Sequence, residues 1–304
     1  MKKILMLLLF WVTCHPIVSA CDVCGASTDN VFGLLPMYKH FVGLRYQYRS
    51  FQVEHPPLFS FEEISYSKNY YHNAELWGRY SFLKNRFQAY AFIPFQHYRQ
   101  NESGKLSLGQ GFGDVRLQLQ GLIVNSSDSA AYNLRHTLRA GVGIKLPTGK
   151  SSISTESWVL LAPNLQPGTG SVDIPLNLIY TLQYRKVGLN MELNYRINTS
   201  APKSGYHFGN RLTTTIQAFL RQEIKTALLL PYVGVGWEQM QVDRKSGILQ
   251  DFTGGQSLSA TIGTEVFFNR VSFGLNMQVP VWQNLGEGYI NAGWQGNLRF
   301  LYLF

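Results

Sequence analysis

The chain has 304 residues, with 27 basic against 18 acidic side chains and therefore a formal net charge of +9. Only 15% of the residues are charged, whereas 45% are hydrophobic and 14% are aromatic. This composition excludes a disordered chain, because there is ample apolar surface to bury. It also excludes a polytopic helical membrane protein, because after residue 20 no run approaches the roughly 18 apolar residues of a spanning helix.

The first twenty residues are predicted to be an export signal. Lys2 and Lys3 precede an apolar stretch at 4–12, and Val18-Ser19-Ala20 supplies the small residues that a signal peptidase recognises. We therefore expect cleavage after Ala20 and exclude residues 1–20 from the fold. A short segment, 21–39, then precedes the first predicted strand.

Cys21 and Cys24 are the cysteines that remain after this cleavage, since Cys14 leaves with the signal. An exported protein can keep a disulfide between them. Val18-Ser19-Ala20-Cys21 also fits the bacterial lipobox, which would make Cys21 an acylated anchor. A metal or redox site is a third alternative, although two thiolates alone do not complete a four-ligand zinc site. Two inert thiols are the fourth, and the sequence leaves all four open.

From residue 40 onward, apolar and polar residues alternate along twelve segments. The clearest is 187–198, where Val187, Leu189 and Met191 begin an apolar register. Period two over this length indicates a strand with one apolar and one polar face, and a membrane-crossing strand needs about 9–11 residues. The other segments are 42–49, 74–82, 87–95, 114–120, 138–146, 174–182, 210–221, 227–238, 257–268, 271–281 and 292–304.

The predicted connections alternate between short and long without exception. The short ones are 83–86, 124–132, 185–186, 222–226 and 268–270, and the long ones are 52–69, 97–111, 147–170, 199–208, 239–255 and 280–291. Outer-membrane barrels have short periplasmic turns and longer outer loops. The pattern therefore predicts an all-β protein, a transmembrane antiparallel β-barrel of about twelve strands over 40–304. It also predicts an outer-membrane location with both termini, and hence the segment 21–39, in the periplasm.

The last predicted strand ends in an aromatic residue, Phe304, after Phe300 and Tyr302 in the same register. Such an ending resembles the signal that the outer-membrane assembly machinery recognises on barrel proteins. This machinery and the membrane lipid are therefore the expected partners. Aromatic residues near strand ends suit the girdles at the two membrane surfaces: Tyr46, Tyr48, Tyr80, Trp237 and Trp294.

Placing the polar register of each strand inward puts twelve basic and six acidic residues in the lumen, an excess of about six positive charges. The pore-lining candidates are Arg45, Arg49, Glu75, Arg79, Asp114, Arg116, Arg139, Lys145, Glu192, Arg196, Glu265 and Arg299. The other inward charges are Arg135, Asp173, Arg185, Arg211, Arg221 and Glu238. Charges that face a pore set its ion preference, which predicts a mildly anion-favouring channel. The alternative is that these charges pair across a narrow lumen and close it.

Three glycine-rich motifs follow one another along the chain: Gly111-Phe112-Gly113-Asp114, Lys145-Leu146-Pro147-Thr148-Gly149-Lys150 and Gly168-Thr169-Gly170-Ser171-Val172-Asp173. With these motifs the chain resembles the outer-membrane barrel family named after the meta-pathway of phenol degradation. The C-x-x-C-G start and the segment 44–51 resemble a branch common in Bacteroidota-type bacteria. The resemblance implies an outer-membrane location and passive passage of small solutes, and it carries over no catalytic residue. We expect the motifs to form turns at loop mouths.

We therefore predict a channel for small, anionic or aromatic solutes. A closed barrel with a structural or partner-docking role, lipid-anchored at Cys21, is the alternative. No serine–histidine spacing singles out a nucleophile, so we expect no catalytic residue, and we expect neither a cofactor nor a metal. Nucleic acid is not an expected partner, because the basic residues are spread over strands and face inward.

Overall fold

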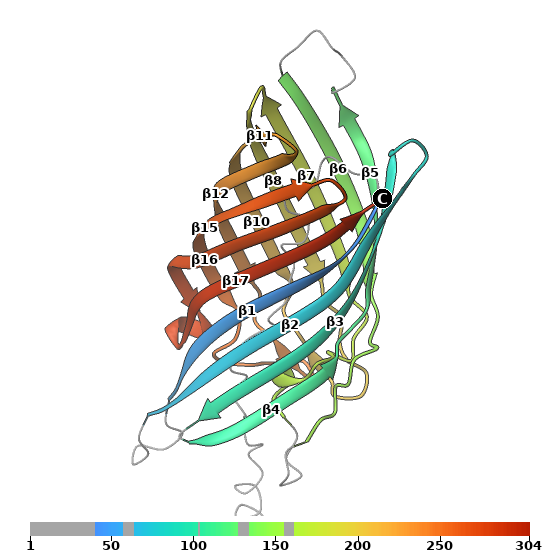
Figure 1. The fold of residues 1–304 in the computed structure, drawn as a ribbon. Helices are drawn as coiled ribbons and strands as arrows, with labels where there is room; N and C mark the ends of the chain where they lie inside the picture. The colour runs from blue at the N-terminus through green and yellow to red at the C-terminus, as the bar shows by residue number, and fades with distance from the viewer. Residues whose placement is uncertain (1–39, 57–63, 103, 127–133, 155–160) are drawn as a thin grey trace, which may run out of the picture.

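The chain folds into a closed barrel of twelve tilted antiparallel strands (Figure 1). The structure, a computed structural model, describes residues 40–56, 64–102, 104–126, 134–154 and 161–304. The barrel strands are β1 Phe41–His55, β2 Ser65–Phe82, β3 Phe87–Glu102, β5 Arg116–Asn125, β6 Leu134–Lys145, β7 Ile174–Tyr184, β8 Val187–Ile197, β10 Arg211–Leu220, β12 Ala227–Met240, β15 Gly255–Phe268, β16 Val271–Leu285 and β17 Ile290–Leu303. The pairing of β1 with β17 closes the ring, so the predicted fold class is confirmed. The predicted signal peptide, Cys21 and Cys24 lie outside the described residues.

Shorter elements lie in the connections. They are β4 Lys105–Phe112, β9 Tyr206–His207, β11 Gln222–Ile224, β13 Arg244–Lys245, β14 Ile248–Leu249 and the 3-10 turns η1 Pro163–Leu165 and η2 Gly286–Gly288. β4 extends the sheet along the part of β3 that β5 does not reach, and β9, β13 and β14 form a separate small sheet. In the part of the chain that the structure describes, no helix has the length and apolar character needed to cross a bilayer.

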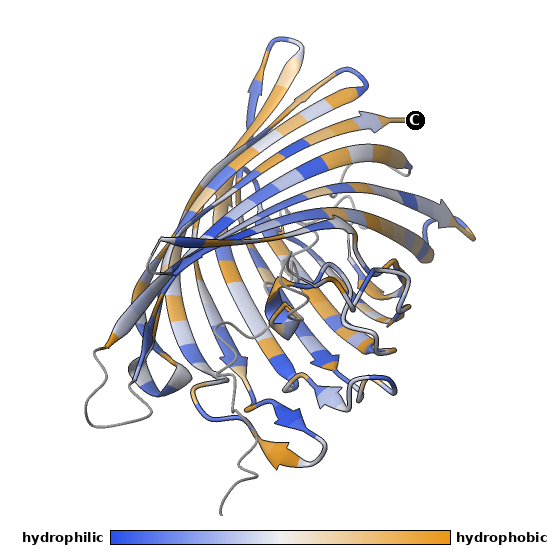
Figure 2. Cartoon of the chain, turned by 90° about the horizontal axis from the view of Figure 1, so that it is seen from below, coloured by the Kyte–Doolittle hydropathy of each residue, from blue (hydrophilic) through white to orange (hydrophobic). Residues whose placement is uncertain are grey.

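The alternating sequence pattern separates the two faces of the wall. In β1, Val42 and Leu44 are exposed on the outer face, whereas Arg45 and Gln47 are buried on the inner face. The same alternation of apolar and polar residues recurs along the other strands (Figure 2). The pleat of a strand directs successive side chains to opposite faces. Because a closed ring also satisfies every strand's backbone groups, this wall can lie in lipid with its apolar face outward.

The strands on one side of the barrel, β12, β15, β16, β17, β1, β2 and β3, run farther toward the long connections than the sequence pattern predicts. β1 continues to His55 and β2 begins at Ser65, so the connection predicted at 52–69 is shorter. The connection predicted at 280–291 covers only 286–289, because β16 and β17 pair again at Leu285 and Ile290 after a register shift beyond Gln278. The prediction of strictly alternating lengths is wrong at this connection. A strand that projects beyond the bilayer no longer needs a lipid-facing apolar register, so the pattern stops before the pairing does.

The interior is apolar at the end with the short turns, which the assignment of polar residues to the inner face did not predict. Side chains from β1, β2, β3, β10, β12, β15 and β17 form this short-turn cluster: Phe41, Trp77, Tyr90, Phe92, Phe219, Leu228, Leu230, Tyr232, Phe267, Leu301 and Leu303. Gly188 of the neighbouring strand β8, which pairs directly with Phe219, makes room for this ring, since a Cβ there would lie 2.1 Å from it. Among the described residues, this cluster therefore consists of wall residues alone, and they close this end.

A second apolar cluster lies inside the barrel at the end with the long connections. This long-loop cluster consists of Phe51, Val53, Tyr71, Tyr98, Leu161, Leu165, Leu285 and Ile290. Leu161 and Leu165 do not belong to the wall but to the connection between β6 and β7. The Asn164 side-chain amide donates a hydrogen bond to the Tyr71 hydroxyl at 3.0 Å, which ties η1 to β2. A connection that folds inward thus completes the closure of this end.

Candidate functional site

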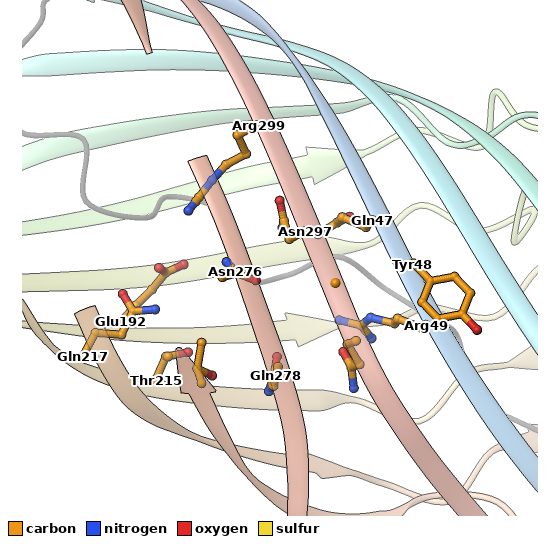
Figure 3. Close-up of a pocket in the computed structure, with 13 residues that line it drawn as sticks. Gln47, Tyr48, Arg49, Glu192, Thr215, Gln217, Asn276, Gln278, Asn297 and Arg299 are labelled. Carbon is orange, nitrogen blue, oxygen red and sulfur yellow. The ribbon is translucent and has the colours of Figure 1, made fainter. Parts of the chain in front are cut away.

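Between the two clusters lies a polar chamber (Figure 3). Amide and hydroxyl side chains dominate its lining: Gln47, Thr215, Gln217, Thr261, Asn276, Gln278, Gln295 and Asn297, together with Arg49, Glu192 and Arg299. They come from β1, β8, β10, β15, β16 and β17, so only barrel closure brings them together. The cavity measures about 50 Å³. At about 10–15 Å³ for each water molecule, it holds roughly three to five waters and no larger organic solute.

Glu75 is the centre of the charge network next to this chamber. Its carboxylate forms an ion pair with the Arg45 guanidinium and a second one, at 2.7 Å, with that of Arg116. Both arginines also contact the short-turn cluster, because their guanidinium carbons lie 5.9 Å and 4.8 Å from the centre of the Phe92 ring. Guanidinium groups over aromatic faces are attracted by the ring quadrupole. The network therefore joins the polar chamber to the short-turn cluster.

Two further ion pairs connect strands of the wall, one across the intervening β16 and one between neighbouring strands. Arg299 of β17 pairs with Glu265 of β15 and donates a hydrogen bond of 3.2 Å to the Tyr232 hydroxyl. Arg211 of β10 pairs with Glu238 of β12. A buried charge is costly unless an opposite charge and hydrogen bonds compensate it. These pairs therefore have a structural role in the interior, whether or not they also line a pathway for solutes.

The three glycine-rich motifs meet at the long-loop end, around the Asp114 carboxylate. This carboxylate accepts hydrogen bonds from the backbone N–H groups of Gly149 at 3.0 Å and Thr169 at 2.9 Å, and from the Thr169 hydroxyl at 2.8 Å. A Cβ on Gly168 would lie 2.4 Å from the Gly149 backbone. Glycine is therefore required where the connections cross. In the structure the motifs contact one another at the barrel mouth, the place expected for them.

Lys145, which begins the second motif, links all three motifs through a buried ion-pair cluster. Its ammonium lies 3.0 Å from Asp114 Oδ2 and 2.5 Å from Asp173 Oδ2. Asp173 also accepts hydrogen bonds from the Ser171 hydroxyl at 2.9 Å and from the Thr199 backbone N–H at 3.1 Å. One ammonium against two carboxylates leaves this Lys145 cluster with a formal charge of −1. It fastens both ends of the connection between β6 and β7 to the wall.

The interior is less positive than the sequence predicts. Five basic and five acidic side chains form the interior ion pairs and cancel in charge: Arg45, Arg116, Lys145, Arg211 and Arg299 with Glu75, Asp114, Asp173, Glu238 and Glu265. The remaining interior candidates are Arg49, Arg79, Arg139, Arg196 and Glu192, an excess of three positive charges.

Three cations predicted to face the lumen lie at the rim instead. Arg135 and Arg185 are exposed near the short turns, and Arg221 pairs at 2.9 Å with the exposed Glu223. Strand ends and turns leave the inner face of the wall, which period-two counting alone does not show. The predicted lumen charge of about +6 is therefore wrong, and the interior retains half of it.

The residues that close the lumen were not identified from the sequence. Phe41, Trp77 and Phe219 occupy the inward register but are apolar, and Leu161 and Leu165 lie in a connection without period-two alternation. The available signal was the switch from polar to aromatic residues in the inward register near the strand ends. Among the described residues, no three His, Cys, Asp or Glu side chains are grouped as a metal site would require.

The barrel was compared with solved structures. The COG4313 outer membrane channel from Pseudomonas putida F1 superimposes with a TM-score of 0.67 at 14% sequence identity, over 91% of this chain and 100% of that chain. The fold is that of an outer-membrane β-barrel. This likeness supports the resemblance to the meta-pathway family at the level of the fold alone.

More distant barrels are similar only in outline. The translocator domain of autotransporter NalP from Neisseria meningitidis has a TM-score of 0.44 at 12% identity, over 90% of each chain. The beta domain of the Bordetella autotransporter BrkA has a TM-score of 0.43 at 11% identity, over 88% of this chain and 100% of that chain. No family model and no curated protein matches the sequence.

Proposed function

We propose that the protein is an outer-membrane channel for the passive passage of small solutes, with both termini in the periplasm. The observation that carries this proposal is the polar chamber, where neutral amides and hydroxyls from five strands, with Glu192 from a sixth, surround a cavity. Polar interiors are typical of barrels that conduct water and solutes. The fold shared with the Pseudomonas putida channel supports the same conclusion.

The side chains around the chamber favour small anionic or aromatic solutes. The excess of three positive charges favours anions, although the paired charges reduce this preference compared with a lumen of free arginines. Arg45 and Arg116 present their guanidinium groups to the Phe92 ring. A solute ring could replace Phe92 in these contacts and gain the same cation–π attraction.

We infer that this conformation corresponds to a closed state of the proposed channel. Apolar clusters close both ends of the interior, and hydrophobic constrictions block ions because water leaves them. Conduction therefore requires that both clusters move apart, at least transiently. The long-loop cluster includes residues of a connection, whereas the short-turn cluster consists of wall residues alone.

The test is the conductance of the refolded barrel in a planar bilayer, with the reversal potential measured under a salt gradient. We expect small unitary steps and a reversal potential that leans toward anions. Unitary steps without ion preference would support the channel but contradict the anion preference inferred from the interior charge. Silence from a barrel shown to be folded by its heat-modifiable gel mobility would contradict the channel.

A second function is favoured by a specific observation, the closure of both ends. A closed barrel of this kind would serve as a structural or partner-docking protein, with Cys21 as a lipid anchor. Mass spectrometry of the mature N-terminus distinguishes a lipid-anchored closed barrel from one without the anchor. An acylated Cys21 supports the anchor, and an unmodified Cys21 contradicts it.

A further inference from the structure

The outer face of β1, β2 and β3 changes character toward the long connections. The strand pairing aligns outward side chains in successive rows: Leu44, Leu76 and Ile93; Tyr46, Ala74 and Phe95; Tyr48, His72 and His97; Ser50, Tyr70 and Arg99; Gln52, Lys68 and Asn101. The first two rows are apolar or aromatic, as a lipid-facing surface requires. The third is aromatic and imidazole-bearing, and the last two are polar and carry two cations.

The third row marks the level of the membrane surface. The Tyr46 hydroxyl and the His72 Nδ1 are hydrogen-bonded at 2.7 Å, and the Tyr48 ring lies 5.3 Å from His72 and 4.6 Å from Trp294. His97 follows on the next strand, 5.9 Å from His72. Rings with one apolar and one polar end gather at the headgroup level of a bilayer. The apolar band of this face therefore ends at this row.

Arg99 and Lys68 lie one and two rows beyond this girdle. Rows on a strand are about 6.8 Å apart, so both cations are placed at the depth of the lipid headgroups. They are diagonal neighbours on paired strands, with backbones about 7–8 Å apart, and their long side chains can converge on a single group. Glu54 is the acidic residue of the outward register, and it lies in the row beyond Lys68.

These two cations differ in exposure and in pairing from the cations inside the barrel. Both side chains are exposed. Within the described residues, neither the Lys68 ammonium nor the Arg99 guanidinium has an ion-pair or hydrogen-bond partner, whereas interior cations such as Arg45 and Lys145 are paired with carboxylates. Arginine binds phosphate oxygens through two parallel N–H groups, and lysine adds a compact charge.

We propose that Lys68 and Arg99, above the girdle of Tyr48, His72 and His97, bind the phosphate of a lipid headgroup in the leaflet that faces the long connections. This inference rests on the membrane placement in the proposed function, but not on conduction. A phosphate at this site would supply the ion-pair partner that the two exposed cations lack among the described residues. Its acyl chains would then lie along the apolar rows below the girdle.

The experiment is native mass spectrometry of the full refolded barrel with diphosphoryl lipid A and with the same lipid after removal of its phosphates. We expect the wild-type barrel to bind the phosphorylated lipid more tightly. The double variant K68Q/R99Q should lose about tenfold or more of that affinity, because each cation near an anionic lipid surface contributes substantially to binding. The control K84Q/R86Q removes two exposed cations from the turn at the opposite end and should leave the affinity unchanged.

Three outcomes would overturn the proposal. They are equal binding of the two lipids, unchanged binding by K68Q/R99Q, and an equal loss in the control variant. Inorganic phosphate is included as a competitor, because displacement of the lipid by millimolar phosphate would indicate a site for the free ion. Heat-modifiable gel mobility verifies that each variant is folded. Bilayer conductance is recorded in parallel, so that a silent but lipid-binding barrel refutes the channel and leaves this site in place.

Discussion

The two ends of the barrel interior are closed in different ways. At the short-turn end, wall residues such as Trp77 and Phe219 point inward and meet one another. At the long-loop end, Leu161 and Leu165 enter from a connection, which the Lys145 cluster fastens to the wall. A closure made by the wall can change only if the strands themselves deform. A closure made by a connection can change while the paired strands stay intact, so the two ends should respond differently to substitution.

The largest effect is expected at the Lys145 cluster. In K145M, the Asp114 and Asp173 carboxylates would remain buried without their cation, which costs about 3–5 kcal/mol of unfolding free energy. A urea titration followed by heat-modifiable gel mobility measures this loss. The control K150M changes an exposed lysine of the same connection and should alter stability by less than about 0.5 kcal/mol. Equal stability of K145M and wild type would show that the cluster does not fasten the connection.

Trp77 tests the closure made by the wall. Replacing it with alanine removes a fully buried side chain, and we expect a loss of about 3 kcal/mol in unfolding free energy together with larger conductance steps. L76A, on the outer face of the same strand, removes a lipid-facing side chain and should leave the conductance unchanged. If W77A conducts like wild type, the short-turn cluster is not the constriction.

Leu165 tests the closure made by the connection. L165A should cost about 2 kcal/mol, at the low end for a buried leucine, because a connection relaxes into a cavity more easily than paired strands do. We expect its open probability in bilayer recordings to rise more than that of W77A. The opposite order would show that the wall, and not the connection, controls the passage.

The smallest effect is expected for ion preference. Arg139 lies on the inner side of β6, where its guanidinium donates a hydrogen bond of 3.1 Å to the Asn85 carbonyl. R139E changes the interior charge by two units and should shift the reversal potential toward cations by a few millivolts. R135E makes the same change at the exposed rim and should shift it less. Identical shifts in the two variants would show that the interior charge excess does not determine the ion preference.

The sequence predicted the wall better than the interior. Arg45, Glu75 and Arg299 could be assigned to the inner face because period two determines the face of each residue relative to its neighbours. The partners of these residues could not be predicted. Arg116 reaches Glu75 only because β5 pairs with the first half of β3 while β4 takes the second half. The glycine motifs were placed at loop mouths, but their convergence on Asp114 depends on three connections that fold toward one another.

By itself, the sequence determined the twelve strands, their outward apolar register and the ring that they form. These follow from local alternation, which the lipid requires from every strand independently. Only the tertiary structure decided how the interior is filled: which charges pair, where aromatic side chains replace polar ones, and which connection enters the mouth. Those features depend on residues far apart in the chain that meet across a closed lumen, and no local period encodes such distances.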